Sequence, residues 1–213
     1  MADMPRKKRP RLTVRSAAEM LDKPLQQMAQ MLYDQKYPDK GDRVFRTPYY
    51  QHAIAGMRRY FQSGKPALVD TKAEIQSFRQ PSRRDHNYRV LDAFERNPLS
   101  DRRLKPVPNH RYYAQIGDVE LRLSPDMQAT ENGETRIIYF NCRNEEYRPE
   151  TANRLVEIAY WVMRQNGVEI RPDQIEFVDL FTGKVYTVSS CRAATLDSLS
   201  AEAMEVTKLW QEL

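Results

Sequence analysis

The segment between Arg111 and Asn141, RYYAQIGDVELRLSPDMQATENGETRIIYFN, predicts two or three adjacent β-strands. Within it, Asn132-Gly133 is a pair of residues that favours a tight turn between two antiparallel strands. One carboxylate, that of Asp126, lies at the end of the second predicted strand, and the third strand ends with Tyr139, Phe140 and Asn141. A sheet is therefore the centre of the predicted fold, and its polar end is the place to look for a site.

Helical patterns precede these strands. Ser16 and Glu19 form a capping box, which predicts a helix that continues to about Tyr37. Pro24 lies inside this helix and is expected to break or kink it, because proline lacks the backbone N–H that a helix interior needs. Further helices are predicted over residues 47–64, 71–78 and 87–96.

The region after the strands predicts a helix, a hairpin and another helix. Apolar residues repeat at helical spacing between Pro149 and the stop signal Asn166-Gly167, so this helix is expected to pack on the sheet. Thr182-Gly183 joins two predicted strands, and the chain then finishes in a helix. These elements cover residues 149–167, 175–181, 184–189 and 199–213.

Together these patterns predict an α/β (α+β) fold in which a central mixed sheet is flanked by helices and preceded by a helical extension. A chain of 213 residues that is 40% hydrophobic has room for one good core. Residues 1–12 are rich in charge and poor in apolar groups, which predicts disorder. The expected organisation is a disordered basic tail (1–12), a helical part with an Arg-rich loop (13–105) and a sheet-containing core (106–213).

The charge is distributed unevenly around a formal total of +5. Residues 1–105 contain 23 Lys/Arg and 12 Asp/Glu, whereas residues 106–213 contain 11 Lys/Arg and 17 Asp/Glu. Such a bipolar chain suits an anionic polymer on one side and a basic partner or cations on the other. The alternative is that the helical surfaces are simply rich in arginine.

Several classes of protein are disfavoured. The chain has no apolar run of membrane-spanning length and no hydrophobic segment behind its basic start, so neither a membrane span nor a secretory signal is expected. Two cysteines and three histidines lack the spacing of a disulfide framework or a zinc site. We therefore expect no cofactor and an intracellular protein, with the cytoplasm and the nucleus left open.

The phrase Leu121-Arg-Leu-Ser-Pro-Asp126 and the order of the elements over residues 111–181 resemble the core of the PD-(D/E)XK nuclease superfamily. The resemblance implies magnesium-dependent cleavage of phosphodiesters by an Asp at a strand end, an Asp or Glu on the next strand and a Lys two residues later. Asp126 matches the first position. Tyr139 and Asn141 stand at the other two, and a phenol and an amide do not replace a carboxylate and an amine.

Three interpretations of Asp126 follow. It is a lone metal and catalytic ligand in a rearranged site, a remnant in an inactive nuclease, or a turn residue after Pro125 that caps its own backbone. Magnesium is expected as a cofactor only under the first interpretation. An active site of the usual type is the least favoured reading, because its partner residues are missing.

The preferred prediction is a pseudoenzyme: a nucleic-acid binding or processing protein on a nuclease-like frame, without the standard metal-dependent activity. DNA is favoured as the partner, and RNA is left open. One alternative is an adaptor that docks on another protein through the C-terminal helix, which carries Met204, Leu209 and Trp210; a second is an active nuclease with an atypical metal site. The residues predicted to bind phosphates are Arg58, Arg59, Arg83, Arg84, Arg102 and Arg103.

Overall fold

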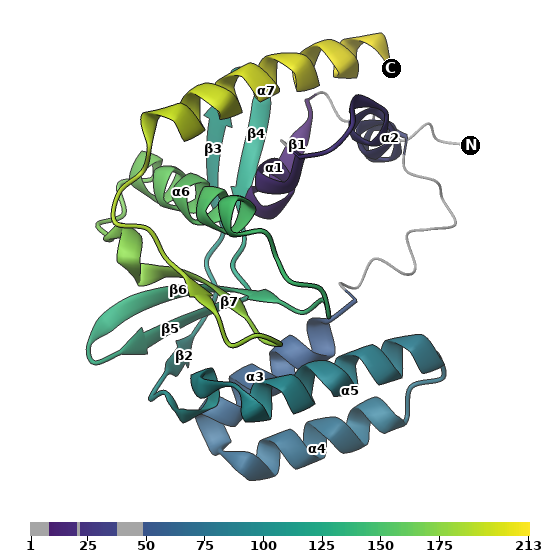
Figure 1. Cartoon of the computed structure of the whole chain (residues 1–213), viewed down its shortest axis with the longest axis vertical. Coiled ribbons are helices and arrows are strands. Elements are labelled where there is room, and N and C mark those ends of the chain that lie inside the picture. The colour runs from purple at the N-terminus through teal and green to yellow at the C-terminus, as the bar shows by residue number, and fades with distance from the viewer. Residues whose placement is uncertain (1–8, 21, 38–48) are drawn as a thin grey trace.

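The computed structural model describes residues 9–20, 22–37 and 49–213 of the chain. These residues form a mixed α/β structure with two sheets, which confirms the predicted α+β class (Figure 1). One sheet has the strand order β1-β4-β3 and the other has the order β2-β5-β6-β7-β8. The predicted single central sheet is thus divided, because the strands before and after Asp126 belong to different sheets.

The elements have the following bounds. The helices are α1 (Val14–Met20), α2 (Leu25–Lys36), α3 (Gln51–Ser63), α4 (Lys65–Gln76), α5 (Pro81–Arg96), α6 (Pro149–Gln165) and α7 (Ala193–Glu212), with 3-10 turns η2 (Pro98–Asp101) and η3 (Pro172–Gln174). The strands are β1 (Arg11–Thr13), β2 (Lys105–Val107), β3 (Tyr112–Ile116), β4 (Val119–Leu123), β5 (Met127–Glu131), β6 (Glu134–Asn141), β7 (Ile175–Asp179) and β8 (Val185–Tyr186).

The five-stranded sheet is mixed. Strands β5 and β6 form an antiparallel hairpin whose turn is the predicted Asn132-Gly133, both with positive φ (51° and 83°). Strand β7 lies parallel to β6, and helix α6 connects the two. Every residue of β7 is buried, as expected for an internal strand covered on both faces.

The three-stranded sheet includes the beginning of the described chain. In β4, Val119, Leu121 and Leu123 are buried and alternate with partly exposed residues, so one face of this sheet packs inward. Strand β1 pairs in parallel with β4, with Leu12 opposite Leu121. Residues 11 and 12 therefore lie in a strand rather than in the predicted disordered tail, whereas residues 1–8 lie outside the described part.

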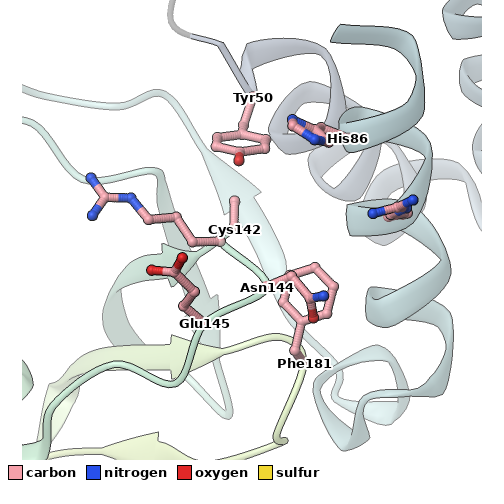
Figure 2. A pocket seen from close by; sticks show the side chains of 8 residues that line it. Tyr50, His86, Cys142, Asn144, Glu145 and Phe181 are labelled. Carbon is pink, nitrogen blue, oxygen red and sulfur yellow. The ribbon is translucent and has the colours of Figure 1, made fainter. Parts of the chain in front are cut away.

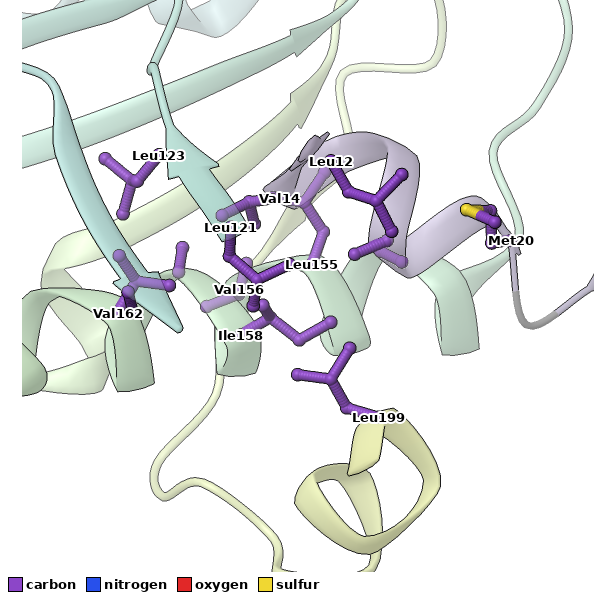
Figure 3. Packing of buried hydrophobic residues seen from close by; sticks show 14 of the residues in the cluster. Leu12, Val14, Met20, Leu121, Leu123, Leu155, Val156, Ile158, Val162 and Leu199 are labelled. Carbon is purple, nitrogen blue, oxygen red and sulfur yellow. The ribbon is translucent and has the colours of Figure 1, made fainter. Parts of the chain in front are cut away.

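A first core lies between α6 and the three-stranded sheet and continues to α1 and α7 (Figure 3). Met28 and Leu32 of α2 also belong to it. Leu155, Ile158 and Val162 of α6 are fully buried in it, which confirms the predicted apolar stripe of this helix. Leu199 of α7 enters the same core, so the last helix covers α6. Ile137, Tyr139, Ile175 and Phe177 bring one face of the five-stranded sheet into this core.

A second core fills the opposite face of the five-stranded sheet, which packs against α3, α4 and α5. Met57 and Phe94 of the helices meet Met127 and Phe140 of the strands there. Helices α3 and α4 approach closely at Gly56, where a Cβ atom would lie 2.6 Å from Cγ2 of Thr71. Helices α3, α4 and α5, which we call the helical unit, are therefore part of the folded body rather than an appended arm.

Several helix boundaries differ from those predicted. The break at Pro24 is confirmed. Helix α1 starts at Val14, before the predicted cap at Ser16. The capping hydroxyl is that of Thr13, which accepts the backbone N–H of Ser16 at 3.0 Å. Helices α4 and α5 are longer than predicted, and α7 begins earlier. Because α5 covers residues 81–96, much of the predicted Arg-rich loop is helical. The predicted helix start at Thr47-Pro48 lies outside the described residues.

The end of helix α2 contacts the C-terminal end of the chain. The Lys36 ammonium donates a hydrogen bond to the Trp210 carbonyl at 2.6 Å, and the Tyr37 hydroxyl donates to the Leu213 carbonyl at 2.8 Å. Trp210 itself is buried in the first core. Over residues 9–20, 22–37 and 49–213, we find no helix with the length and apolar character required to cross a membrane.

Arg102 ties the helical unit to the five-stranded sheet. Its guanidinium donates to Glu131 on β5 at 2.6–2.8 Å and to Glu176 on β7 at 2.5–2.9 Å. Arg136 on the intervening strand β6 lies 3.4 Å from Glu131 and 3.8 Å from Glu176. Hydrogen bonds from Arg102 lower the pKa of Glu131, so the network favours the ionised form of this carboxylate.

We expect Arg102→Ala to lower the free energy of unfolding by about 2–4 kcal/mol, because Glu176 stays buried and loses its closest cation. Urea denaturation of both proteins measures this change. The matched control is Arg103→Ala, which removes an exposed neighbour that makes no ion pair among the described residues and should change stability by less than about 0.5 kcal/mol. Equal losses in the two variants would contradict the structural role of Arg102.

His52 on α3 gives the helical unit a pH-dependent contact. The centroid of its ring lies 4.6 Å from that of the Phe78 ring, and the Arg83 guanidinium lies 5.9 Å from the centroid of the Phe78 ring. Burial, followed by the nearby charge of Arg83, lowers the pKa of His52 below its ordinary value of 6.5. The folded state therefore favours the neutral ring.

A group with a depressed pKa contributes stability above its unfolded pKa and loses it as the pH falls through the folded value. We therefore expect the free energy of unfolding to fall as the pH drops below about 6.5, and His52→Phe to make this part of the profile flatter. Chemical denaturation at a series of pH values tests the slope. His110→Gln, in an exposed loop, is the control and should keep the wild-type slope.

Candidate functional site

The centre of the candidate site is an ion pair between Arg15 and Asp126. Arg15 lies in the first turn of α1, and Asp126 lies in the short link that carries the chain from β4 in one sheet to β5 in the other. Arg15 Nη2 donates to Asp126 Oδ2 at 2.8 Å and to the Phe140 carbonyl at 3.1 Å. The same Oδ2 accepts the backbone N–H of Phe140 at 2.8 Å.

These contacts decide how Asp126 is used. Burial raises the pKa of its carboxyl, and the Arg15 charge and the Phe140 N–H oppose that shift. The Arg15 guanidinium also lies 5.8 Å from the Tyr139 ring and 5.6 Å from the Phe177 ring, so aromatic faces enclose the cation. The described residues give Asp126 no side-chain hydrogen bond to its own turn, and its carboxylate instead contacts two other segments, α1 and β6.

Tyr139 and Asn141 occupy the positions where the resemblance implies an acid and a lysine, and their environments differ. Tyr139 is 2% exposed, burial raises its pKa, and its hydroxyl has no hydrogen-bond partner among the described residues. Asn141 is fully engaged: its amide donates to the Glu145 carbonyl and to Asp179, and its oxygen accepts the Arg143 N–H at 3.0 Å. Asn141 therefore shapes the loop between β6 and α6.

Asp179, at the end of β7, is a polar residue that the sequence reading missed. It is fully buried, and its Oδ1 accepts the backbone N–H groups of Phe181 and Thr182 at 3.0–3.1 Å. Its Oδ2 accepts the Asn141 amide at 3.1 Å. The carboxylate thus fixes the turn after β7 against the loop after β6. A charge that ends the apolar run IEFVD was the available signal.

Between the helical unit and these two loops lies a cavity of about 380 Å³, which we call the seam cavity. Figure 2 shows Tyr50 and His86 on the side of the helices, facing Cys142, Glu145 and Phe181 across the opening. Tyr49 links the two helical residues, with ring centroids 5.1 Å from Tyr50 and 5.5 Å from His86. The full lining is Tyr50, His86, Arg89, Cys142, Arg143, Asn144, Glu145 and Phe181.

A smaller cavity of about 190 Å³ adjoins the seam cavity and reaches the ion pair. Arg15, Asp126, Phe140 and Asn141 line it, and it shares Tyr50, Cys142 and Arg143 with the larger one. Burial raises the pKa of Cys142 well above its ordinary value, so the thiol stays protonated and is a poor nucleophile. The ion pair therefore lies at the inner end of an opening whose outer part is aromatic and basic.

A divalent metal has few ligands here. Within residues 9–20, 22–37 and 49–213, no group of three His, Cys, Asp or Glu side chains is arranged to hold a metal ion. One carboxylate oxygen of Asp126 already accepts two hydrogen bonds, and both carboxylate oxygens of Asp179 accept hydrogen bonds. The chemistry that this arrangement supports is binding and positioning through charge, amide groups and aromatic faces.

The predicted phosphate-binding arginines differ in whether they already have partners. Arg59 makes a two-pronged pair with Glu74 at 2.8–2.9 Å, and Arg58 donates to the Val107 carbonyl at 3.2 Å. Arg102 is held by two carboxylates, as described above. These three side chains therefore have structural partners, and a phosphate would have to compete with them.

The other three predicted arginines differ in exposure. Arg83 is partly buried beside Phe78, Arg84 pairs with its neighbour Asp85 at 3.2 Å, and Arg103 is exposed. The sequence reading did not single out Arg89, which reaches the seam cavity from α5. Its signal was present in the Arg-rich stretch, but only the helix places it beside His86.

Of the apolar residues predicted to bind a protein partner through the last helix, two are used inside the molecule. Trp210 is 6% exposed and Leu209 packs against the first core, whereas Met204 is 67% exposed. The helix thus covers α6 and α2 with most of its apolar face.

No family model matches this chain, and no curated protein sequence matches it.

We expect a double-mutant cycle on Arg15 and Asp126 to give a coupling free energy of about 1–3 kcal/mol. Arg15→Met alone should cost about 2–3 kcal/mol, because it leaves Asp126 without its cation in a partly buried place. Arg15→Met combined with Asp126→Asn should cost less than the sum of the two single changes. Chemical denaturation of the four proteins measures the cycle.

The control is Arg11→Met, which breaks the more exposed pair between Arg11 and Glu120. Surface pairs of this kind contribute about 0–1 kcal/mol. If Arg15→Met costs no more than Arg11→Met, the ion pair is not a structural centre.

Proposed function

We propose that this protein binds nucleic acid without cleaving it, on a frame like the PD-(D/E)XK core in which Arg15 takes the place of the metal ion. The order of elements supports the frame: β5 and β6 pair antiparallel, α6 follows, and β7 lies parallel to β6. Asp126 directly precedes β5 and contacts β6, where an acidic metal ligand is expected in such a frame.

The observation that carries this proposal is that the Asp126 carboxylate is already occupied by donors of the chain itself. A nuclease of this class would present this acid to Mg²⁺ together with a second carboxylate. Here the acid receives the Arg15 guanidinium and a backbone N–H on the same oxygen, and the adjacent strand offers the phenol of Tyr139. The positive charge is thus supplied by the chain itself, which favours a binding role over hydrolysis.

The exposed face of α5 supports a polyanionic ligand. Lys72 forms ion pairs with Asp92 and Glu95 of this helix, and Arg84 pairs with Asp85. Arg89 and Arg96 are exposed and, in the part of the chain that the structure describes, make no ion pair or hydrogen bond. They are seven residues apart and lie on the same face of the helix, about 10 Å apart along its axis.

The phosphate contacts that we propose therefore differ from the arginines expected from sequence alone. Arg89 and Arg96 replace Arg59 and Arg102, whose guanidinium groups already have carboxylate partners. Arg103 keeps its proposed role because it is exposed. Arg89 connects this basic face to the seam cavity, so one ligand would contact both.

If binding follows these charges, the affinity for a DNA or RNA oligonucleotide should fall steeply as salt is added. The plot of log affinity against log salt concentration should lose roughly one unit of slope for each arginine removed in Arg89→Ala and Arg96→Ala. Arg164→Ala, an exposed change at the far end of α6, is the control and should keep the wild-type slope. An affinity that does not respond to salt would contradict the proposal.

The absence of cleavage has its own test. We expect plasmid DNA and a single-stranded oligonucleotide to stay intact with the protein and Mg²⁺ or Mn²⁺. Cleavage that persists through purification and disappears in Asp126→Ala would contradict this and favour an active nuclease with an atypical metal site. Cleavage that survives Asp126→Ala comes from elsewhere, and a contaminating nuclease is then sought by further purification.

A further inference from the structure

The seam is held by buried polar side chains whose hydrogen bonds are all made. Asn87 contacts the Ala53 N–H and the Tyr49 and Arg83 carbonyls, and Asn97 contacts the Asp179 and Leu180 carbonyls and the Leu99 N–H. Asn141 and Asp179 are equally engaged. Such satisfied groups fix the walls of the seam, since breaking any of them would leave a buried polar atom unpaired.

The polar side chains that line the seam cavity, in contrast, have few hydrogen-bond partners within the protein. The side chains of Arg89, Asn144 and Glu145 and the Tyr50 hydroxyl make no hydrogen bond among the residues that the structure describes. Arg143 is 59% exposed, and its nearest carboxylate, that of Glu19, is 3.8 Å away. The cavity therefore combines a rigid surround with donors and acceptors that are available to a ligand.

Size and composition indicate the class of ligand. About 380 Å³ falls within the roughly 300–1,000 Å³ of small-molecule sites. Tyr50 and Phe181 offer aromatic faces, on which a base can stack. Arg89 and Arg143 offer cations, and arginine suits phosphate because its planar fork donates two parallel hydrogen bonds. Asn144 and Glu145 present an amide and a carboxylate, the groups that pair with base edges.

We propose that the seam cavity binds a single nucleotide through its base and its phosphate. The base stacks against Tyr50 or Phe181, Arg89 and Arg143 hold the phosphate, and Asn144 and Glu145 contact the edge of the base. The nucleotide is either free or the phosphorylated end of a strand that continues along the basic face of α5. The strand-end form rests on the proposed function, whereas the free form does not.

The test measures three ligands against the folded wild-type protein: a 3′-labelled single-stranded oligonucleotide with a 5′-phosphate, the same oligonucleotide with a 5′-hydroxyl, and the four nucleoside monophosphates. Fluorescence anisotropy follows the labelled strands, and calorimetry follows the free nucleotides. We expect the phosphorylated strand to bind about tenfold more tightly than the hydroxyl strand, and a monophosphate to compete with it.

The decisive variants are Arg143→Ala and Asn144→Ala. Both residues are exposed and make few contacts of their own, so the fold should be retained, as circular dichroism and urea denaturation will check. Arg143→Ala should remove most of the preference for the 5′-phosphate and leave the binding of the hydroxyl strand unchanged. Asn144→Ala should weaken the binding of a monophosphate, because it removes a contact to the edge of the base. Arg164→Ala removes the same charge elsewhere and should leave both unchanged.

The outcomes separate this inference from the proposed function. Salt-dependent binding of strands with no phosphate preference, no monophosphate binding and no effect of the two variants would overturn the nucleotide site while leaving the proposed function in place. Binding of monophosphates without any strand binding would support the site and overturn the proposed function. No binding of any of the three ligands would overturn both.

Discussion

The contact between Arg15 and Asp126 joins three parts of the chain that are far apart in sequence: the first turn of α1, the link between the two sheets, and β6. Because both side chains are largely enclosed, each needs the other, and the loss of either partner leaves a charge in surroundings that solvate it poorly. The Phe140 N–H and carbonyl complete the contact, so the end of β6 is set by it. The positions of Asn141, of the loop that follows, and of the seam cavity then depend on this one pair.

Around this pair, polar side chains fall into two groups with different consequences. Buried amides and Asp179 have made their hydrogen bonds and hold the helical unit, the sheet and two loops in one arrangement. Exposed groups on the other side of the same loops have made none among the described residues. A rigid frame beside unsatisfied donors and acceptors is the usual construction of a binding site, because the frame limits the entropy lost when a ligand binds.

Local signals predicted the parts of the fold that local signals control. Asn132-Gly133 correctly predicted the hairpin, Pro24 the break between two helices, and the apolar stripe the helix α6. The parallel pairing of β1 with β4 brings Leu12 beside Leu121, and no local pattern in a basic segment announces such a partner. The same holds for charge. Arg102 is held by two glutamates and Arg89 is not, and a count of arginines does not distinguish the two. The role of Asp126 depended on an arginine 111 residues away.

The two cores also differ in how much of the chain they require. The second core draws on residues between Ala53 and Leu180, whereas the first needs Leu12 at one end and Trp210 at the other. On a ribosome, which delivers the chain from its N-terminus at about 5–20 residues per second, the helical unit and the five-stranded sheet have all their residues first. Helix α2 is made early, yet the helix that packs against it is α7, which is made last. The apolar side of α2, with Met28 and Leu32, therefore stays uncovered until α7 has left the exit tunnel, and the nascent protein exposes an apolar segment over that time.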